Sequence, residues 1–135
     1  SKGLQFKAVI LPYCQWKLDH SGTNEQLLWC ETDGSTVLGQ VPYLPVRYKK
    51  DLAQTIFAKN FYLEKSDVYL DNLNLLYVAL TRAEEALFIL SDVKLSSKGI
   101  SNVGDILLNY ARDKSLLEGE LNAIALGKLP PYSVY

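Results

Sequence analysis

The chain has few of the residues from which metal sites are built and no segment long enough to cross a membrane. Its 135 residues include two cysteines, Cys14 and Cys30, a single histidine, His20, and no methionine. These are too few and too widely spaced for a structural zinc site, so we predict no bound metal. We expect free thiols in a reducing cytoplasm, with a disulfide as the open alternative. No hydrophobic run approaches the roughly 20 residues that span a bilayer, so we expect a soluble, cytoplasmic protein without a membrane partner.

An excess of charge of either sign is also absent. The 14 lysines and arginines nearly balance the 15 aspartates and glutamates. This balance argues against binding nucleic acid through overall charge, but it allows local contact through a few groups. The sequence has neither a G-x-S-x-G nucleophile elbow nor an acidic cluster followed by a strand lysine. These absences argue against a small α/β hydrolase or a nuclease.

The strongest pattern that is present lies at residues 73–90, LNLLYVALTRAEEALFIL. Hydrophobic residues recur there at helical spacing and predict a helix over 68–83 that is buried on most sides. The unbroken hydrophobic run at 86–90 is typical of a strand covered on both faces in a parallel sheet. Arg82 stands between this helix and this strand. Its planar, permanently charged fork of donors matches phosphate oxygens.

A second strand is predicted near the start of the chain. Residues 6–12, FKAVILP, are hydrophobic and rich in β-branched side chains. We expect this strand to pair in parallel with the strand at 86–90, with the ends of both strands at one edge of the sheet. In the turn before it, Gly3 lets the backbone approach a phosphate and Lys2 adds a cation. The simpler alternative is a tight turn with a solvent-facing lysine.

The rest of the chain is less regular. Residues 48–65 predict an amphipathic helix, and Ser66 with Asp67 is expected to end it and to cap the next helix. Short hydrophobic pieces at 27–30 and 36–38 favour two strands of a hairpin-like excursion. A further short helix is expected from Val103, capped by the serine or the asparagine before it.

Two of these segments resemble motifs of one protein family. Leu76 to Ala83, LYVALTRA, resembles the sixth conserved motif of the UvrD/Rep-type superfamily 1 DNA helicases, and Ser1 to Phe6, SKGLQF, resembles the tail of their fifth motif. The run DNLNLLY at 71–77 is similar to the AddA/RecB-like, exonuclease V-type branch. The resemblance is specific over 1–12 and 61–90. It rests on both motifs occurring in the family's order, each beside a predicted strand.

The resemblance implies an α/β fold, namely an incomplete RecA-like (P-loop NTPase-type) domain with a mainly parallel sheet flanked by helices. The chain would be a single domain over residues 1–135, part of the C-terminal motor domain (domain 2A). Motif V would lie at 1–12, a variable insertion at 13–47, motif VI at 73–90 and a C-terminal helical tail at 100–135. We therefore expect the chain to be an excised piece of a longer protein.

The resemblance also assigns a catalytic residue and its neighbours. Arg82 would be an arginine finger that reaches the γ-phosphate of ATP, which is bound with Mg²⁺ mainly by the missing N-terminal motor domain. Thr81 would position Arg82 or contact the nucleotide. Gln5 stands where the family commonly has glutamate, and its amide oxygen still accepts a hydrogen bond to the nucleotide, although without the charge. The alternative for Arg82 is a surface salt bridge with Glu84 or Glu85.

The opening turn would contact both ligands. By resemblance, Ser1, Lys2 and Gly3 couple the nucleotide site to the DNA track, and Gly3 also counts among the nucleotide-binding residues. The implied partners are single-stranded or duplex DNA, the N-terminal RecA-like domain of the same full-length chain and, as a further candidate, a nuclease domain or subunit.

The resemblance implies the second motor domain of an ATP-dependent DNA helicase or translocase in DNA repair or recombination. The phosphate loop G-x-x-x-x-G-K-[ST] and a hydrophobic strand ending in paired acids, which would hold Mg²⁺, are both missing from the sequence. We therefore expect the isolated chain to be inactive. The alternative is a non-catalytic docking or regulatory module that keeps the helicase-domain fold.

Overall fold

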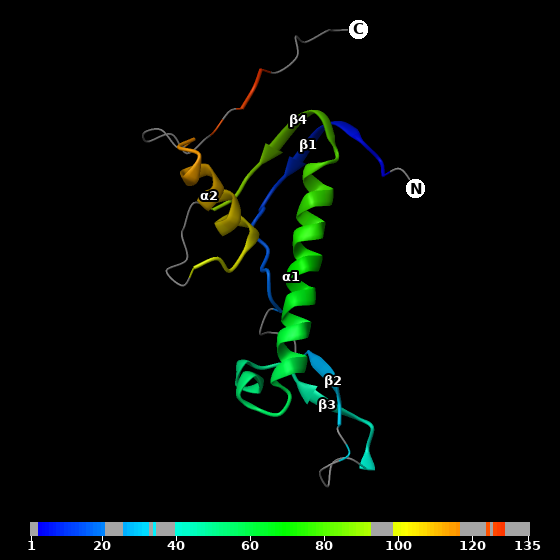
Figure 1. The fold of residues 1–135 in the computed structure, drawn as a ribbon. Coiled ribbons are helices and arrows are strands. Elements are labelled where there is room, and N and C mark those ends of the chain that lie inside the picture. Colours follow the sequence, from blue (N-terminus) through cyan, green and yellow to red (C-terminus); the bar gives the residue numbers. More distant parts are fainter. Residues whose placement is uncertain are drawn as a thin grey trace. The chain divides into compact units, whose positions relative to one another are not determined.

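The computed structural model describes residues 3–20, 26–32, 34, 40–92, 99–116, 124 and 126–128. Its elements in chain order are β1 (Phe6–Leu11), β2 (Leu27–Glu31), β3 (Tyr43–Arg47), the 3-10 helix η2 (Lys50–Gln54), α1 (Ala58–Leu80), β4 (Ala83–Ile89) and α2 (Val103–Asp113) (Figure 1). The chain divides into two compact units. The first unit comprises Ser1–Leu18 and Asn72–Tyr135, and the second unit comprises Asp19–Asp71.

The first unit contains a two-stranded parallel sheet. β1 pairs with β4 in parallel from Phe6 opposite Ala83 onward, and Figure 1 shows the two strands side by side. The predicted parallel pairing of strands at 6–12 and 86–90 is therefore confirmed, although β4 begins earlier, at Ala83. The fold class is confirmed as α/β with a small parallel sheet and helices, which is compatible with a partial RecA-like domain.

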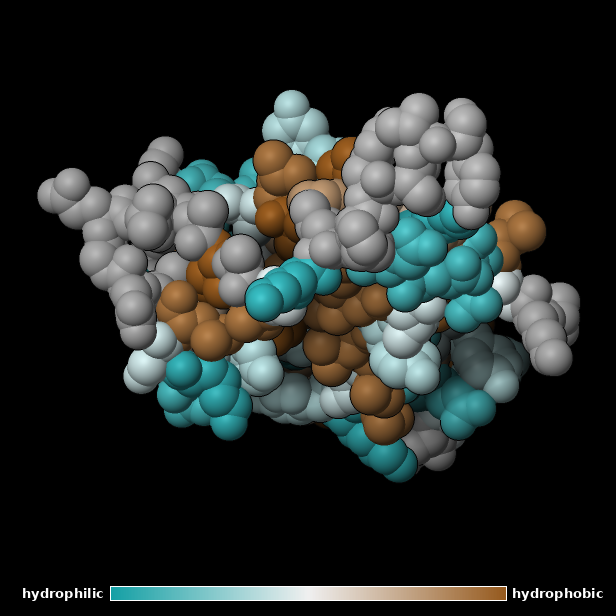
Figure 2. All heavy atoms as spheres, turned by 90° about the horizontal axis from the view of Figure 1, so that it is seen from above, coloured by the Kyte–Doolittle hydropathy of each residue, from teal (hydrophilic) through white to brown (hydrophobic). Residues whose placement is uncertain are grey.

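Burial in this unit differs from the prediction. The strand at 86–90 and the helix before it were expected to be covered on most sides, but Phe88 is 46% exposed and Tyr77 is 69% exposed. Leu76 is buried, whereas its neighbour Leu75 is not. The prediction of burial is therefore wrong for the described residues. A hydrophobic pattern indicates that a segment can be buried, but the described part of the chain has too few neighbouring segments to cover this strand and this helix. Figure 2 shows such hydrophobic residues on the molecular surface.

Helix α1 is continuous from Ala58 to Leu80. The predicted break and N-cap at Ser66 and Asp67 are wrong, since both residues lie inside this helix with exposed side chains. Serine and aspartate favour a cap only where the preceding chain turns away, and in mid-helix their side chains can simply face solvent. The predicted helix at 48–65 is likewise replaced by η2 and the first turns of α1.

Helix α2 confirms the short helix expected from Val103, with Asn102 as its cap. The Asn102 Oδ1 accepts a hydrogen bond from the Asp105 backbone N–H (2.9 Å), and the buried Asp105 carboxylate accepts in return from the backbone N–H of Ser101 (2.8 Å) and of Asn102 (3.2 Å). The Val103 N–H donates to the Trp16 carbonyl oxygen (3.0 Å). The start of α2 is thereby tied to the segment that follows β1.

The second unit contains an antiparallel pair of strands. β2 pairs with β3, with Leu27 opposite Arg47 and Glu31 opposite Tyr43. The strand predicted at 27–30 is confirmed, whereas the strand predicted at 36–38 lies outside the described residues. β3 contains a proline, which a two-stranded ladder tolerates because each of its strands is an edge strand.

Aromatic and polar contacts hold the second unit around α1. The Tyr48 hydroxyl donates to Asp19 Oδ1 (2.9 Å), and the Tyr48 ring stacks on that of Phe61 with centroids 5.0 Å apart. His20 Nε2 lies 2.7 Å from Glu64 Oε1. These contacts join the segment at Asp19 to the N-terminal turns of α1 within this unit.

The hydrophobic core of the described residues is small. Its buried members are Cys14, Leu18, Leu76, Val103 and Ala111 in the first unit and Cys30, Leu52 and Phe61 in the second. Both cysteines are free, as expected, and burial raises the pKa of each thiol. Within the described part of the chain, no helix combines the length and hydrophobicity needed to span a membrane.

Candidate functional site

The turn that ends α1 positions Arg82 directly before β4. The Thr81 hydroxyl donates to the Tyr77 carbonyl oxygen (2.9 Å) and lies 3.2 Å from that of Val78, and the Thr81 N–H also donates to Tyr77 (3.0 Å). The Arg82 N–H donates to the Ala79 carbonyl oxygen (3.4 Å). The last carbonyls of α1 are thus satisfied by the threonine and the arginine that follow it. In this arrangement the Thr81 hydroxyl stabilises the helix end.

The Arg82 side chain lies against the opening turn of the chain. Its Nη1 donates to the Leu4 carbonyl oxygen (3.3 Å), and the Arg82 carbonyl oxygen accepts from the Phe6 N–H (2.9 Å). A Cβ atom at Gly3 would overlap the Arg82 guanidinium. Glycine therefore provides the space that the guanidinium occupies. The two motifs that the sequence singled out are in direct contact.

No carboxylate neutralises Arg82 among the described residues. Glu84 and Glu85 are exposed in β4, and neither forms an ion pair with the guanidinium in that part of the chain. The partner of the guanidinium is instead a neutral backbone carbonyl. Because a guanidinium carries five N–H donors, Arg82 keeps donors and a net positive charge for an anionic ligand.

The remaining predicted residues divide into two groups. Gly3 and Gln5 are exposed in the turn that contacts Arg82. Ser1 and Lys2 lie outside the described residues. The structure thus brings Gly3 and Arg82 together and leaves the nucleotide and DNA roles of all these residues as predictions.

The site lies at the amino ends of the two parallel strands. Gly3 and Leu4 precede β1, Arg82 precedes β4, and Phe6 is opposite Ala83 where the pairing begins. Ligands of open α/β sheets usually bind at the carboxyl ends. The prediction based on this rule is therefore wrong about the end of the sheet, because the contact between Gly3 and Arg82 lies where the chain enters the two strands. The Leu4 carbonyl is a partner of Arg82 that sequence reasoning missed, because a backbone acceptor has no sequence signal.

A metal centre is not formed by the described part of the chain. No group of three or more histidine, cysteine, aspartate or glutamate side chains with the geometry to hold an ion occurs among those residues. The positioned guanidinium of Arg82 and the nearby backbone are groups that can recognise an anion.

A helicase/nuclease subunit is similar in sequence to this chain over 101 residues. Across this region, which is 75% of the chain, the sequence is 34% identical to an ATP-dependent helicase/nuclease subunit of Ligilactobacillus salivarius (strain UCC118). The chain spans only about 8% of the length of that relative. No family model matches the chain, and no solved structure matches it. The chain is thus a partial homologue of a helicase/nuclease subunit.

Proposed function

We propose that the chain is part of the C-terminal RecA-like motor domain (domain 2A) of a UvrD/Rep-type, AddA/RecB-like DNA helicase that acts in DNA repair or recombination. The observation that carries this proposal is the contact between Arg82 and Gly3, which joins the two motifs at one edge of a parallel sheet. The similarity to the helicase/nuclease subunit of L. salivarius supports it.

In this function Arg82 is the arginine finger. ATP and Mg²⁺ would be held mainly by the N-terminal RecA-like domain of the same full-length chain, where the metal ion would supply positive charge at the phosphates. The Arg82 guanidinium donates to the γ-phosphate oxygens, where negative charge is distributed during phosphoryl transfer. Gly3 leaves the space for this guanidinium, and the Leu4 carbonyl orients it. Gln5, in the same turn, offers an amide oxygen to the nucleotide.

The same contacts provide a route from DNA to the nucleotide. In the proposed arrangement Ser1, Lys2 and Gly3 contact the DNA track. The Leu4 carbonyl and the Phe6 N–H connect the following residues to the side chain and backbone of Arg82. A displacement of the turn by a DNA strand then displaces the guanidinium. ATP hydrolysis is thereby made to depend on DNA.

The proposal is tested by Arg82→Ala in the full-length protein. An arginine finger contributes about 10³-fold or more to kcat, so the rate of single-strand-stimulated ATP hydrolysis should fall by that order. Arg112→Ala is the matched control, because Arg112 is an exposed arginine on α2. Arg82→Lys should restore little, since an ammonium lacks the planar fork.

The alternative is a docking or regulatory module that keeps the fold without the chemistry. The exposed hydrophobic side chains of α1 and β4 favour this alternative, because uncovered hydrophobic surface marks interaction sites. An ATPase rate that is unchanged by Arg82→Ala would support this alternative and refute the motor assignment.

A further inference from the structure

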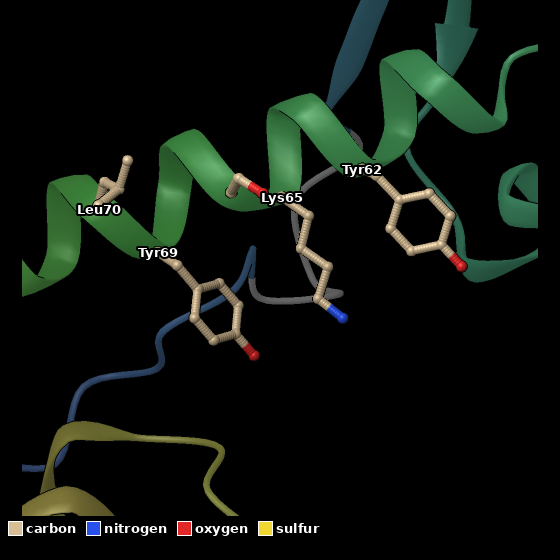
Figure 3. Close-up of a pocket in the computed structure, with 5 residues that line it drawn as sticks. Tyr62, Lys65, Tyr69 and Leu70 are labelled. Carbon is tan, nitrogen blue, oxygen red and sulfur yellow. The ribbon is translucent and has the colours of Figure 1, made fainter.

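A row of aromatic and cationic side chains lies on one face of α1 in the second unit. Tyr62, Lys65 and Tyr69 are three and four residues apart, so they are neighbours on the helix surface. Figure 3 shows the three side chains extending from the same side of α1. They line a shallow hollow together with Ser66 and Leu70. We call Tyr62, Lys65 and Tyr69 the tyrosine–lysine face.

The face presents flat rings and a cation to solvent. Tyr62 is 56% exposed, and Tyr69 is partly exposed. The Lys65 ammonium lies 5.8 Å from the centre of the Tyr69 ring, within the range of a cation–π contact. In the view of Figure 3 this ammonium lies between the two tyrosines. The two tyrosines are about 10 Å apart along the helix axis, given the rise per residue, so each ring can contact a different part of a ligand.

The Tyr62 ring is braced from inside the second unit. The buried Phe61 ring meets the Tyr62 ring edge-on, with centroids 5.3 Å apart, and stacks on Tyr48 on its other side. Tyr62 is therefore partly preorganised, which lowers the entropy cost of ordering it on a ligand. The contact between His20 Nε2 and Glu64 Oε1 lies on another side of α1.

The charges of α1 are segregated around this face. The acidic residues Glu64, Asp67 and Asp71 also recur at helical spacing, but their row is offset from the row of tyrosines by two residues. That offset is a rotation of about 200°, which places the acids on the opposite side of the helix. Lys59, one turn before Tyr62, is exposed and adds a second cation at the edge of the face. From α1 the face thus presents positive charge only.

We propose that the tyrosine–lysine face binds single-stranded DNA, with unpaired bases stacked on Tyr62 and Tyr69 and a backbone phosphate near Lys65. Exposed aromatic rings interleaved with cations are the combination that binds a single strand without reading its sequence. Duplex DNA fits less well, because its bases are already stacked on one another and offer no free ring face to Tyr62 and Tyr69. The choice of DNA rests on the proposed function, whereas the stacking and charge rest on this face alone.

The test measures how tightly a short fluorescein-labelled oligothymidylate binds to the 135-residue chain in the absence of nucleotide. Fluorescence anisotropy reports the binding. Tyr62→Leu and Tyr69→Leu remove a ring but keep a helix-forming, hydrophobic side chain. Each substitution should weaken binding about 5- to 150-fold, the range that corresponds to loss of one base stacked on an aromatic ring. Tyr110→Leu is the matched control, since Tyr110 is a 57% exposed tyrosine on α2, and it should change binding less than twofold.

The contribution of Lys65 is read from the salt dependence. Lys65→Gln removes one phosphate contact, so the slope of log K against log salt should become shallower by about 0.7. Lys114→Gln, at an exposed lysine that ends α2, should leave the slope unchanged. Circular dichroism of every variant checks that the helices remain folded, and only variants with the spectrum of the original chain are compared.

Three results would overturn the proposal. The first is oligothymidylate affinity that is unchanged in Tyr62→Leu and Tyr69→Leu. The second is duplex DNA that binds as tightly as the single strand. The third is displacement of the oligothymidylate by polyglutamate at the same concentration of negative charges, which would identify a general anion site or an acidic protein partner.

A parallel measurement separates this inference from the proposed function. In the full-length protein, Tyr62→Leu with Tyr69→Leu should raise the DNA concentration that half-maximally stimulates ATPase, and it should leave the DNA-independent rate unchanged. Arg82→Ala should abolish stimulated hydrolysis and bind oligothymidylate normally. If the tyrosine variant has the DNA dependence of the original protein and Arg82→Ala loses stimulated hydrolysis, this inference fails and the motor assignment stands. If Arg82→Ala has the ATPase rate of the original protein and the tyrosine variant needs more DNA, the motor assignment fails.

Discussion

The guanidinium of Arg82 occupies the space beside Gly3 that any larger residue would fill. One residue belongs to the turn before β1 and the other to the turn before β4, and the parallel pairing of these strands brings them together. The Leu4 carbonyl then fixes one guanidinium nitrogen. The position of the proposed arginine finger is therefore controlled by the absence of a side chain at Gly3.

Gly3→Ala should impair catalysis without unfolding the protein. The added methyl group displaces the guanidinium, and because this is the end of a flexible, half-buried side chain, the free energy of unfolding should change by less than about 0.5 kcal/mol. A misplacement of about 1 Å at a reacting group costs on the order of 100-fold in rate, so the stimulated ATPase of the full-length protein should fall about 10- to 100-fold.

The control for this substitution is Leu4→Ala. The Leu4 side chain is 78% exposed, and the substitution keeps the backbone carbonyl that Arg82 uses. Its ATPase rate should match that of the original protein. An unchanged rate in Gly3→Ala would show that the guanidinium position beside Gly3 is not the one used in hydrolysis.

Part of this site could be predicted from the sequence. The motif residues identified Gly3 and Arg82 separately, and the two hydrophobic runs correctly predicted parallel strands. Their direct contact could not be predicted, because it depends on a backbone carbonyl and on the register with Phe6 opposite Ala83. The pattern of side chains in a sequence indicates neither the backbone acceptor nor the strand register. The roles of Gln5, Ser1 and Lys2 stay predictions.

The errors in the predicted fold have physical causes. Ser66 and Asp67 resemble a cap in sequence, but hydrophobic spacing continues through them and α1 continues with it. The pattern at 86–90 predicts a strand that can be buried, yet burial depends on neighbours elsewhere. The tyrosine–lysine face could not be predicted, because tyrosines at helical spacing are more often core residues and only their exposure in the structure distinguishes the two cases.

The capping box of α2 should be a major contribution to the stability of the first unit. Asp105 is 3% exposed, and its carboxylate accepts hydrogen bonds from Ser101 and Asn102. Asp105→Ala leaves the partly buried N–H groups of Ser101 and Asn102 without their acceptor and should cost about 2 to 3 kcal/mol of unfolding free energy. Asn102→Ala, which removes the other half of the box, should cost about 1 kcal/mol.

Urea denaturation followed by circular dichroism measures both effects. Asp113→Ala is the control, because Asp113 is an exposed aspartate at the other end of the same helix. A negative charge is unfavourable at a helix C-terminus, so this substitution should be neutral or slightly stabilising. Equal losses in Asp105→Ala and Asp113→Ala would contradict the role assigned to the capping box.

The 135-residue chain alone should not hydrolyse ATP. Its sequence has no phosphate loop and no acidic strand end to hold Mg²⁺, so an arginine finger has no bound nucleotide to act on. A purified sample with Mg²⁺ and single-stranded DNA should release phosphate at the background rate. Robust DNA-stimulated turnover that survives repeated purification would refute the assignment to a C-terminal motor domain.

Tyr48 should make the second unit sensitive to alkaline pH. Burial, and then the hydrogen bond from its hydroxyl to Asp19, raise the pKa of Tyr48 above the value of about 10 that an unfolded tyrosine has. The folded state therefore favours the neutral phenol. The stability that this preference provides is fully present below pH about 10 and is lost as the pH rises above that value, because the unfolded chain then releases the proton more readily.

Tyr48→Phe isolates this effect. At pH 7 the substitution should cost about 1 kcal/mol, because the partly buried hydrogen bond to Asp19 is lost. As the pH rises above about 10, the original chain should lose stability more steeply than Tyr48→Phe, so the difference between them should shrink. Urea unfolding at a series of pH values measures this difference, with Tyr110→Phe as the control at an exposed tyrosine. A difference that stays constant from pH 7 to above pH 10 would show that Tyr48 titrates alike in the folded and unfolded chains.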